Sequence, residues 1–250
     1  MNLHLAILGL LVTATMAHAE TFVVQGSTTF NHQLLKPYQT AIEAASGHNL
    51  RVVPNKSSTG ILALLEGRAQ FAMISAPLAK EIAVLKREHP DLSFARLREF
   101  TVSRTRMAFA VNPENRVREA TTEQMRQILL GKISHWGELG GDDQPIRLVI
   151  VREGGGVQAS VEDHMLNGER ATPAHSIRVQ ISSQVMKIVE QERYALGLAQ
   201  IGLLRRANGT ELVTDQKVTQ RLSLVTQGEP TPAMREVIDA ATRIAIQPSQ

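Results

Sequence analysis

The chain has 250 residues, of which 43% are hydrophobic, and it has no cysteine. This length is enough for one large or two medium domains with their own cores, and without cysteine we expect neither disulfides nor a lipoprotein anchor. The net charge of +3 favours anionic ligands, the lack of a dense basic run excludes a nucleic-acid-binding stripe, and the 4% aromatic content argues against ligands held by ring stacking.

The first 19 residues are apolar, carry no charged side chain and end in Ala17, His18 and Ala19. This A-x-A ending is typical of a secretory signal peptide, although the usual basic residues at its start are missing. We therefore expect residues 1–19 to be a signal peptide that is removed after Ala19, so that the mature protein is periplasmic. No later apolar run is long enough to span a bilayer.

A strand-like run rich in β-branched residues opens the rest of the chain and leads to Ser27, Thr28 and Thr29. Residues 21–30 predict a strand, a turn and the start of a helix. The apolar stripe of that helix has a four-residue spacing: Phe30, Leu34, Tyr38 and Ile42. Hydroxyls and free amides at the positive end of a helix dipole suit an anion, and they also form an ordinary N-cap. For this loop alone both interpretations stay open.

The same arrangement recurs farther along the chain. A second strand-like run is followed by Ser57, Ser58 and Thr59 before another helical pattern. Residues 70–76 form a continuous apolar run that predicts a buried parallel strand, and Ser75 lies near its end. Because the carboxyl ends of parallel strands meet at one edge of a sheet, we expect these hydroxyls to converge with those of the first loop on one ligand.

A glycine-rich loop in the second half of the chain is the other candidate binding element. The strand predicted at residues 146–151 leads into Arg152 and Glu153, and three glycines follow: Gly154, Gly155 and Gly156. Glycines let backbone amides approach a ligand closely, and Arg152 adds five donors and a permanent charge. An Arg152–Glu153 surface pair followed by a flexible turn is the alternative that the residues leave open.

Strands alternate with helices along the chain, which predicts βαβ units and a mostly parallel sheet. Residues 100–113 are long for one strand and are typical of a strand that runs from one domain into the next. The single tryptophan, Trp136, is expected to pack in a core. The histidines lack metal-ligand spacing, and no hydrolase elbow, P-loop or cysteine nucleophile is present, so we expect no metal, no cofactor and no enzymatic activity.

Five segments, in this order, resemble the periplasmic phosphate-binding proteins of ABC transporters: GSTTF, SSTGI, FAMISAPL, GKISHWGELGG and VIVREGGG. The resemblance covers nearly the whole chain after the predicted signal. It implies the α/β type II periplasmic binding fold, in which two lobes, each a mostly parallel sheet flanked by helices, are joined by two interlobe crossovers. Carried over, lobe one is residues 20–106 plus 202–250, and lobe two is residues 107–201.

The lobes of that family close over the anion, and its binding loops match the candidate loops of this chain. The ligand-binding residues that the resemblance implies are Ser27, Thr28, Ser57, Ser58, Thr59, Ser75, Arg152, Gly154, Gly155 and Gly156. Three departures weaken the match. The family usually has an acidic residue at the position of Ser75, where it accepts a proton from hydrogen phosphate. Two hydroxyls of its G-S-G-T loop are lost at Gly155 and Val157, and the acidic residue that follows its arginine is absent or replaced by Glu153.

The resemblance implies a periplasmic solute-binding protein that captures an inorganic oxyanion, most of all phosphate, for an ABC-type uptake system. The expected partners are the anion and an ABC permease or another inner-membrane protein, and the chain is expected to be a monomer that binds no nucleic acid. The alternative is a sensor or scaffold module of the same fold that presents its surface to a membrane partner and has weak or altered anion specificity.

Overall fold

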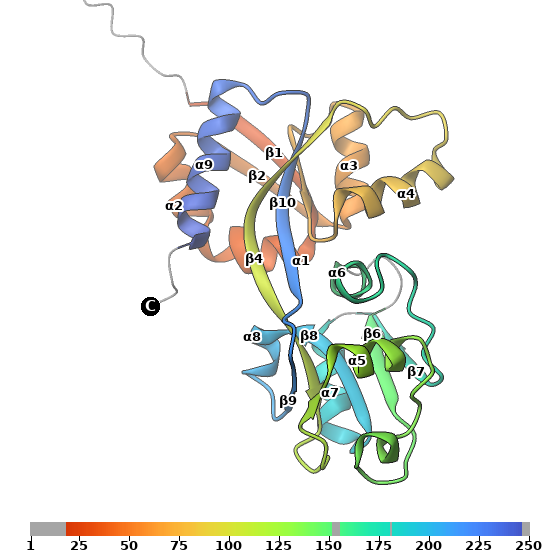
Figure 1. Ribbon diagram of the computed structural model, residues 1–250. Coiled ribbons are helices and arrows are strands. Elements are labelled where there is room, and N and C mark those ends of the chain that lie inside the picture. Colours follow the sequence, from red (N-terminus) through yellow and green to blue (C-terminus); the bar gives the residue numbers. More distant parts are fainter. Residues whose placement is uncertain (1–18, 152–155, 181, 247–250) are drawn as a thin grey trace, which may run out of the picture.

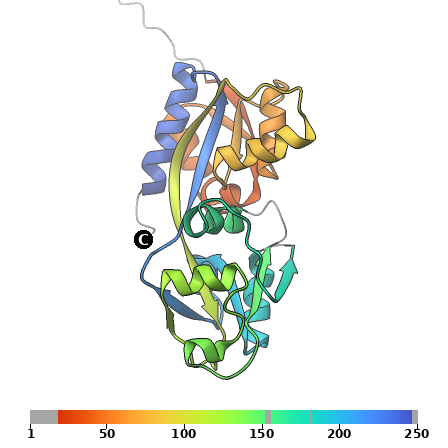
Figure 2. The same cartoon turned by 45° about the vertical axis from the view of Figure 1, so that its right-hand side comes forward.

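The computed structural model describes residues 19–151, 156–180 and 182–246 of the chain. These residues form two lobes, one above the other, with two long strands running between them (Figure 1). The same division is seen when the molecule is turned by 45° (Figure 2).

The first lobe combines the two ends of the described chain. Its strands are β1 (Thr21–Ser27), β2 (Asn49–Asn55), β3 (Phe71–Ile74), the first half of β4 (Leu97–Val111) and β10 (Thr219–Gln227). Its helical segments are α1 (Thr28–Phe30), the π-helical η1 (Asn31–Leu35), α2 (Lys36–Ser46), α3 (Ser57–Leu65), α4 (Leu78–Glu88) and α9 (Pro232–Ile246). The π-helical turn ends at Leu35, and Pro37, whose missing N–H and ring do not fit a regular helix interior, follows as the second residue of α2.

The second lobe is formed by the middle of the chain. Its strands are the second half of β4, β5 (Glu119–Ala120), β6 (Arg147–Val151), β7 (Ser176–Val179), β8 (Ala195–Gln200) and β9 (Thr210–Thr214). Its helices are α5 (Thr122–Leu129), the 3-10 helix η2 (Trp136–Leu139), α6 (Gly156–Met165), α7 (Ser182–Gln191) and α8 (Ile201–Leu204). Trp136 is fully buried in this lobe and its Nε1 donates to the Tyr194 carbonyl oxygen at 3.0 Å, so it packs as expected.

The central strands of each lobe are parallel. In the first, β1 lies between β2 and β3 and is parallel to both, and in the second, β6 lies between β7 and β8 and is parallel to both. The long strands β10 and β4 are antiparallel to each other and to their neighbours β3 and β8. This arrangement confirms the α/β fold class with two lobes and two crossovers.

Strand β4 makes the first crossing. It pairs with β10 as far as Arg106 and with β8 from Met107 onward, which confirms the prediction of one strand that enters both domains. Helices cover both faces of the first lobe: buried residues of α2 and α9 pack on one side of its sheet, and those of α3 and α4 pack on the other.

The return crossing occurs later than the expected boundary at residue 202. Strand β9 pairs with the second half of β4, where Leu212 lies opposite Phe109, and Leu204 and Val218 belong to the cores of the second lobe. The boundary at residue 202 is the one that the family resemblance implies, and the short β9 has no clear strand pattern in the sequence that would move it. We propose instead that the second lobe comprises residues 107–218.

Candidate functional site

The carboxyl ends of β1 and β3 bring two of the expected ligand residues together. Ser27 Oγ donates to Ser75 Oγ at 2.8 Å and accepts a hydrogen bond from the Phe30 N–H at 3.2 Å. The two serines are buried, with 4% and 3% of their surface exposed. Because a hydroxyl has a single proton, that of Ser27 is already used, whereas Ser75 keeps a proton for a ligand. Ser27 is thus also the N-cap of α1.

The second hydroxyl loop lies beside the first. A Cβ atom added to Gly60 would lie 2.3 Å from the Gln25 carbonyl oxygen, so the first turn of α3 packs directly on β1. Ser57, at the start of α3, is buried, whereas Ser58 and Thr59 are half-buried and Thr28 is exposed. The structure therefore places the two loops together, with different exposure of their hydroxyls.

The second lobe reaches this site at Gly156, the first residue of α6, which lies between the lobes in Figure 1. A Cβ atom on Gly156 would lie 2.3 Å from the carbonyl oxygen of Ser75 and 2.6 Å from its Oγ. Only glycine fits such a close approach. Gly156 thus lies against Ser75, while Arg152, Gly154 and Gly155 lie outside the described residues.

Two buried glutamines that sequence reasoning missed connect this site to the crossing strands. Gln220 Nε2 donates to the Ser75 carbonyl oxygen at 2.8 Å, and Gln220 Oε1 accepts from Gln200 Nε2 at 3.2 Å. Gln220 is fully buried and Gln200 is 5% exposed. Gln200 is the last residue of β8, which is parallel to β6, so it lies at a carboxyl strand end, the position where ligands of such sheets bind.

Glu81 is a further residue of this region, and no local pattern in the sequence marks it. It lies on α4 with 8% of its surface exposed, and its side chain is hydrogen-bonded to that of Ser57. Burial raises the pKa of Glu81 from 4.5 to about 7, and the hydrogen bond from Ser57 opposes this shift. The carboxyl group is therefore partly protonated at neutral pH, beside the second hydroxyl loop.

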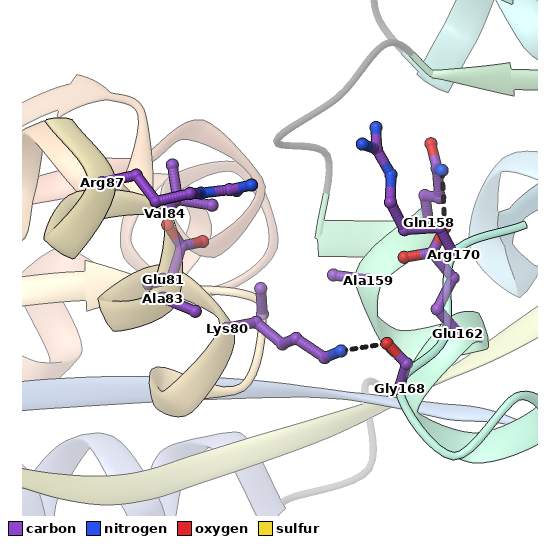
Figure 3. A pocket seen from close by; sticks show the side chains of 11 residues that line it. Lys80, Glu81, Ala83, Val84, Arg87, Gln158, Ala159, Glu162, Gly168 and Arg170 are labelled. Atoms are coloured by element: carbon purple, nitrogen blue, oxygen red, sulfur yellow. Dashed lines mark hydrogen bonds between the residues drawn. The ribbon is translucent and has the colours of Figure 1, made fainter.

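Glu81 also lines a cavity of about 450 Å³ between α4 of the first lobe and α6 of the second (Figure 3). Lys80 Nζ donates to the Gly168 carbonyl oxygen across this cavity, which links the lobes a second time. The residues that line it are Ala76, Lys80, Glu81, Ala83, Val84, Arg87, Gln158, Ala159, Glu162, Gly168 and Arg170.

No helix within the described part of the chain combines the length and the apolar character needed to cross a membrane. The predicted signal peptide lies almost wholly outside the described residues.

Comparison with known proteins supports the resemblance. The chain is 28% identical over 199 residues to the phosphate-binding protein PstS of Bacillus subtilis, an alignment that covers 80% of this chain and 60% of that relative. The chain thus spans less than two thirds of the length of this relative.

Solved structures show the same fold. An ABC-type phosphate transport receptor from Vibrio cholerae is 21% identical, with a TM-score of 0.69 and coverage of 88% of this chain and 93% of the receptor. A putative phosphate ABC transporter substrate-binding protein from Clostridium perfringens, solved with bound phosphate, is 21% identical, with a TM-score of 0.70 and coverage of 88% and 92%. The family model described as the PBP superfamily domain matches residues 12–244. The chain therefore belongs to the PBP superfamily.

Proposed function

We propose that this protein is a periplasmic solute-binding protein that captures an inorganic oxyanion, most of all phosphate, between its two lobes for an ABC-type uptake system. The observation that carries the proposal is the meeting of Ser27 and Ser75, at the strand ends of the first lobe, with Gly156 at the start of a helix in the second. Hydroxyl donors on one side and a glycine at a helix N-terminus on the other suit an oxyanion. The phosphate-binding relative and the phosphate receptors of the same fold support this ligand.

The proposed site consists of the hydroxyl loops and the glycine loop. Its residues are Ser27, Thr28, Ser57, Ser58, Thr59, Ser75, Arg152, Gly154, Gly155 and Gly156. Each hydrogen bond to a charged oxyanion contributes roughly 1.5 to 3 kcal/mol, and a micromolar site needs about 8 kcal/mol, so about three to five such bonds suffice. Lobe closure, which brings the two halves of the site together, is the proposed working motion.

The proposal also includes the export of this protein and its partner at the inner membrane. Residues 1–19 are the signal peptide, the mature protein is a periplasmic monomer, and the partner is an ABC permease or another inner-membrane protein. N-terminal sequencing of the exported protein should begin at Glu20, and a retained Met1 would refute the cleavage. Purification of the protein with a permease complex in the presence of phosphate tests the partner.

Arg152 gives the sharpest test of the ligand site. Phosphate at 100 times its dissociation constant should stabilise the wild type by about 2.7 kcal/mol, and Arg152→Ala should remove this gain while the unliganded protein stays folded. Arg147→Ala is the matched control, because Arg147 is an exposed residue of β6 that pairs with Glu192 and should not affect binding.

A screen with phosphate, sulfate, arsenate and molybdate identifies the preferred anion. If Arg152→Ala binds phosphate as the wild type does, the assigned cleft is wrong. Stabilisation by none of the anions would favour the sensor or scaffold alternative.

A further inference from the structure

The cavity between α4 and α6 adjoins the proposed oxyanion site. Ala76 in its wall follows Ser75 directly, Glu81 in its wall is hydrogen-bonded to Ser57, and α6 begins at Gly156 before it reaches the cavity. The two sites thus share two segments, residues 75–76 and α6, and the hydrogen bond between Glu81 and Ser57 joins α4 of the cavity to α3 of the oxyanion site. One ligand that reaches from the hydroxyl loops past Ala76 would contact both.

The size of the cavity exceeds what an inorganic anion needs. Its volume is about 450 Å³, which lies within the range of roughly 300 to 1,000 Å³ that is usual for sites of small organic molecules. Small apolar side chains, Ala83, Val84 and Ala159, form part of the wall. Such a wall accommodates the carbon atoms of a short chain.

Two buried polar side chains in the wall offer hydrogen-bond acceptors. Gln158 and Glu81 are each 8% exposed, and they come from opposite lobes. Gln158 Nε2 donates to Glu162 Oε1 at 2.7 Å, but no partner for Gln158 Oε1 is present in the described structure. Buried acceptors without a partner are rare and unfavourable, so a donor from a ligand would relieve this one. The Glu81 carboxyl accepts from Ser57 and has capacity for a further donor.

The basic side chains of the cavity are placed differently. Arg87 and Arg170 are exposed, and Lys80 Nζ is bound to the Gly168 carbonyl oxygen (Figure 3). Cationic groups at the mouth attract a negatively charged ligand, whereas the buried positions are the acceptors Glu81 and Gln158. The exposed cations therefore favour the approach of an anionic ligand, and the buried acceptors, beside the carboxylate of Glu162 in the same wall, fit a donor group on that ligand.

We propose that this cavity is a second subsite, which takes a short organic arm attached to a phosphate or phosphonate group and ending in a hydroxyl or ammonium donor. The phosphoryl group lies at the hydroxyl loops, and the donor of the arm binds Gln158 Oε1 and the Glu81 carboxyl. This inference rests on the proposed function and deepens it, because it makes organic phosphates preferred ligands.

Calorimetry with four probes tests the subsite: inorganic phosphate, monoethyl phosphate, glycerol 3-phosphate and phosphoethanolamine. Monoethyl phosphate has an arm without a donor, so it is the matched control for the last two probes. The wild type should bind at least one donor-bearing ester about tenfold more tightly than monoethyl phosphate, as expected for one or two added hydrogen bonds.

Two variants assign the effect to the cavity. Gln158→Met should reduce the preference for the donor-bearing ester by about threefold to tenfold and leave the affinity for inorganic phosphate unchanged, and Glu81→Gln should reduce the same preference by a similar factor. Gln191→Met and Glu88→Gln make the same changes at exposed positions of α7 and α4 and should alter neither affinity. The melting temperature without ligand shows whether each variant is folded. If only one of the two cavity variants folds, that variant alone tests the subsite.

The outcomes separate this inference from the proposed function. Binding of inorganic phosphate without any gain from the donor-bearing esters overturns the subsite alone. A preference for those esters that both cavity variants leave intact also overturns it. Failure of all four probes to bind overturns both proposals.

Discussion

Gly156 of the second lobe lies directly against Ser75 of the first, so closely that a Cβ atom on Gly156 would be 2.3 Å from the Ser75 carbonyl oxygen. Two further atoms of the first lobe would lie close to this Cβ atom: Gln220 Nε2, on β10, at 2.5 Å and Ser75 Oγ at 2.6 Å. A side chain at position 156 therefore opposes this contact between the lobes. We propose that the contact belongs to the closed, anion-binding state.

Gly156→Ala should impair phosphate binding more than folding. Overpacking by one methyl group costs about 1 to 3 kcal/mol, which here falls on the closed state and corresponds to a loss of affinity of about fivefold to more than a hundredfold. Titration calorimetry measures the affinity, and small-angle scattering with and without phosphate shows whether the lobes still close.

Two other glycines provide controls for this variant. Gly202 in α8 has open space around its would-be Cβ, so Gly202→Ala should leave binding unchanged. Gly60 faces the Gln25 carbonyl oxygen within the first lobe, and Gly60→Ala should instead lower the stability of the unliganded protein. Undiminished phosphate affinity in Gly156→Ala would contradict the assignment of this contact to closure.

The buried carboxyl of Glu81 makes stability depend on pH. Its pKa is about 7 in the folded protein and near 4.5 when unfolded, so between these values the unfolded chain releases a proton that the folded chain keeps. Stability from this group is complete below about pH 4.5 and falls as the pH rises to 7 and above, by about 3 kcal/mol in total.

Denaturant titrations from about pH 4.5 to 8 measure this effect. Glu81→Gln cannot ionise and should lack the decline, so that it becomes more stable than the wild type at the alkaline end. Glu88→Gln, an exposed change on the same helix, should decline as the wild type does. Parallel curves for the wild type and Glu81→Gln would show that this carboxyl does not titrate as inferred.

Much of the fold could be predicted because its signals are local. The β-branched run before Ser27 and the four-residue spacing after it define β1 and the helix that follows, and the length of the run at residues 100–113 indicates the crossing strand. Strands β7 and β9 have no such signal, because both are short: β7 is an edge strand with exposed Ser176 and Arg178, and β9 leaves the apolar Val213 exposed. Their pairing depends on neighbours that are distant in the sequence.

The site shows the same division. Hydroxyl residues that follow apolar strands indicated Ser27 and Ser75 directly. Glu81 stands beside Lys80 in a helix with several charged residues, which is the usual pattern of a solvated face, and only the packing of α4 on α3 buries it next to Ser57. Gln158 acquires its role through the cavity between the lobes, which no local pattern describes.

His48 holds the first described residues of the chain in place through hydrogen bonds, and we expect it to contribute to the stability of the fold. Its Nδ1 accepts from the Glu20 N–H at 3.1 Å, and its Nε2 lies 2.9 Å from Glu236 Oε2. His48 is 6% exposed, whereas the Glu236 side chain is 61% exposed. His48→Ala should lower the free energy of unfolding by about 1 to 3 kcal/mol, since it leaves the Glu20 amide without its acceptor and creates a cavity.

Urea denaturation measures this loss. Exposed His89 is the matched control, and His89→Ala should change the unfolding free energy by less than about 0.5 kcal/mol. Equal effects of the two substitutions would contradict an anchoring role for His48.

The resemblance to phosphate-binding proteins implies an acidic residue at the position of Ser75, and we propose that this departure affects specificity. A carboxylate there accepts the proton of hydrogen phosphate and repels an oxyanion without a proton, which separates phosphate from sulfate. The Ser75 hydroxyl accepts from Ser27 and keeps its own proton, which it can donate to any tetrahedral oxyanion. We therefore expect the wild type to discriminate weakly between phosphate and sulfate.

Ser75→Asp should restore discrimination, lowering the affinity for sulfate more than that for phosphate. Ser75→Ala is the control: it removes the donor without adding a charge and should weaken both anions alike. Calorimetry of the three proteins with both anions, at about pH 7.5 and constant ionic strength, compares them under conditions where a carboxylate is ionised. A strong preference for phosphate in the wild type, or equal loss of both anions in Ser75→Asp, would mean that the side chain at position 75 does not contact the ligand.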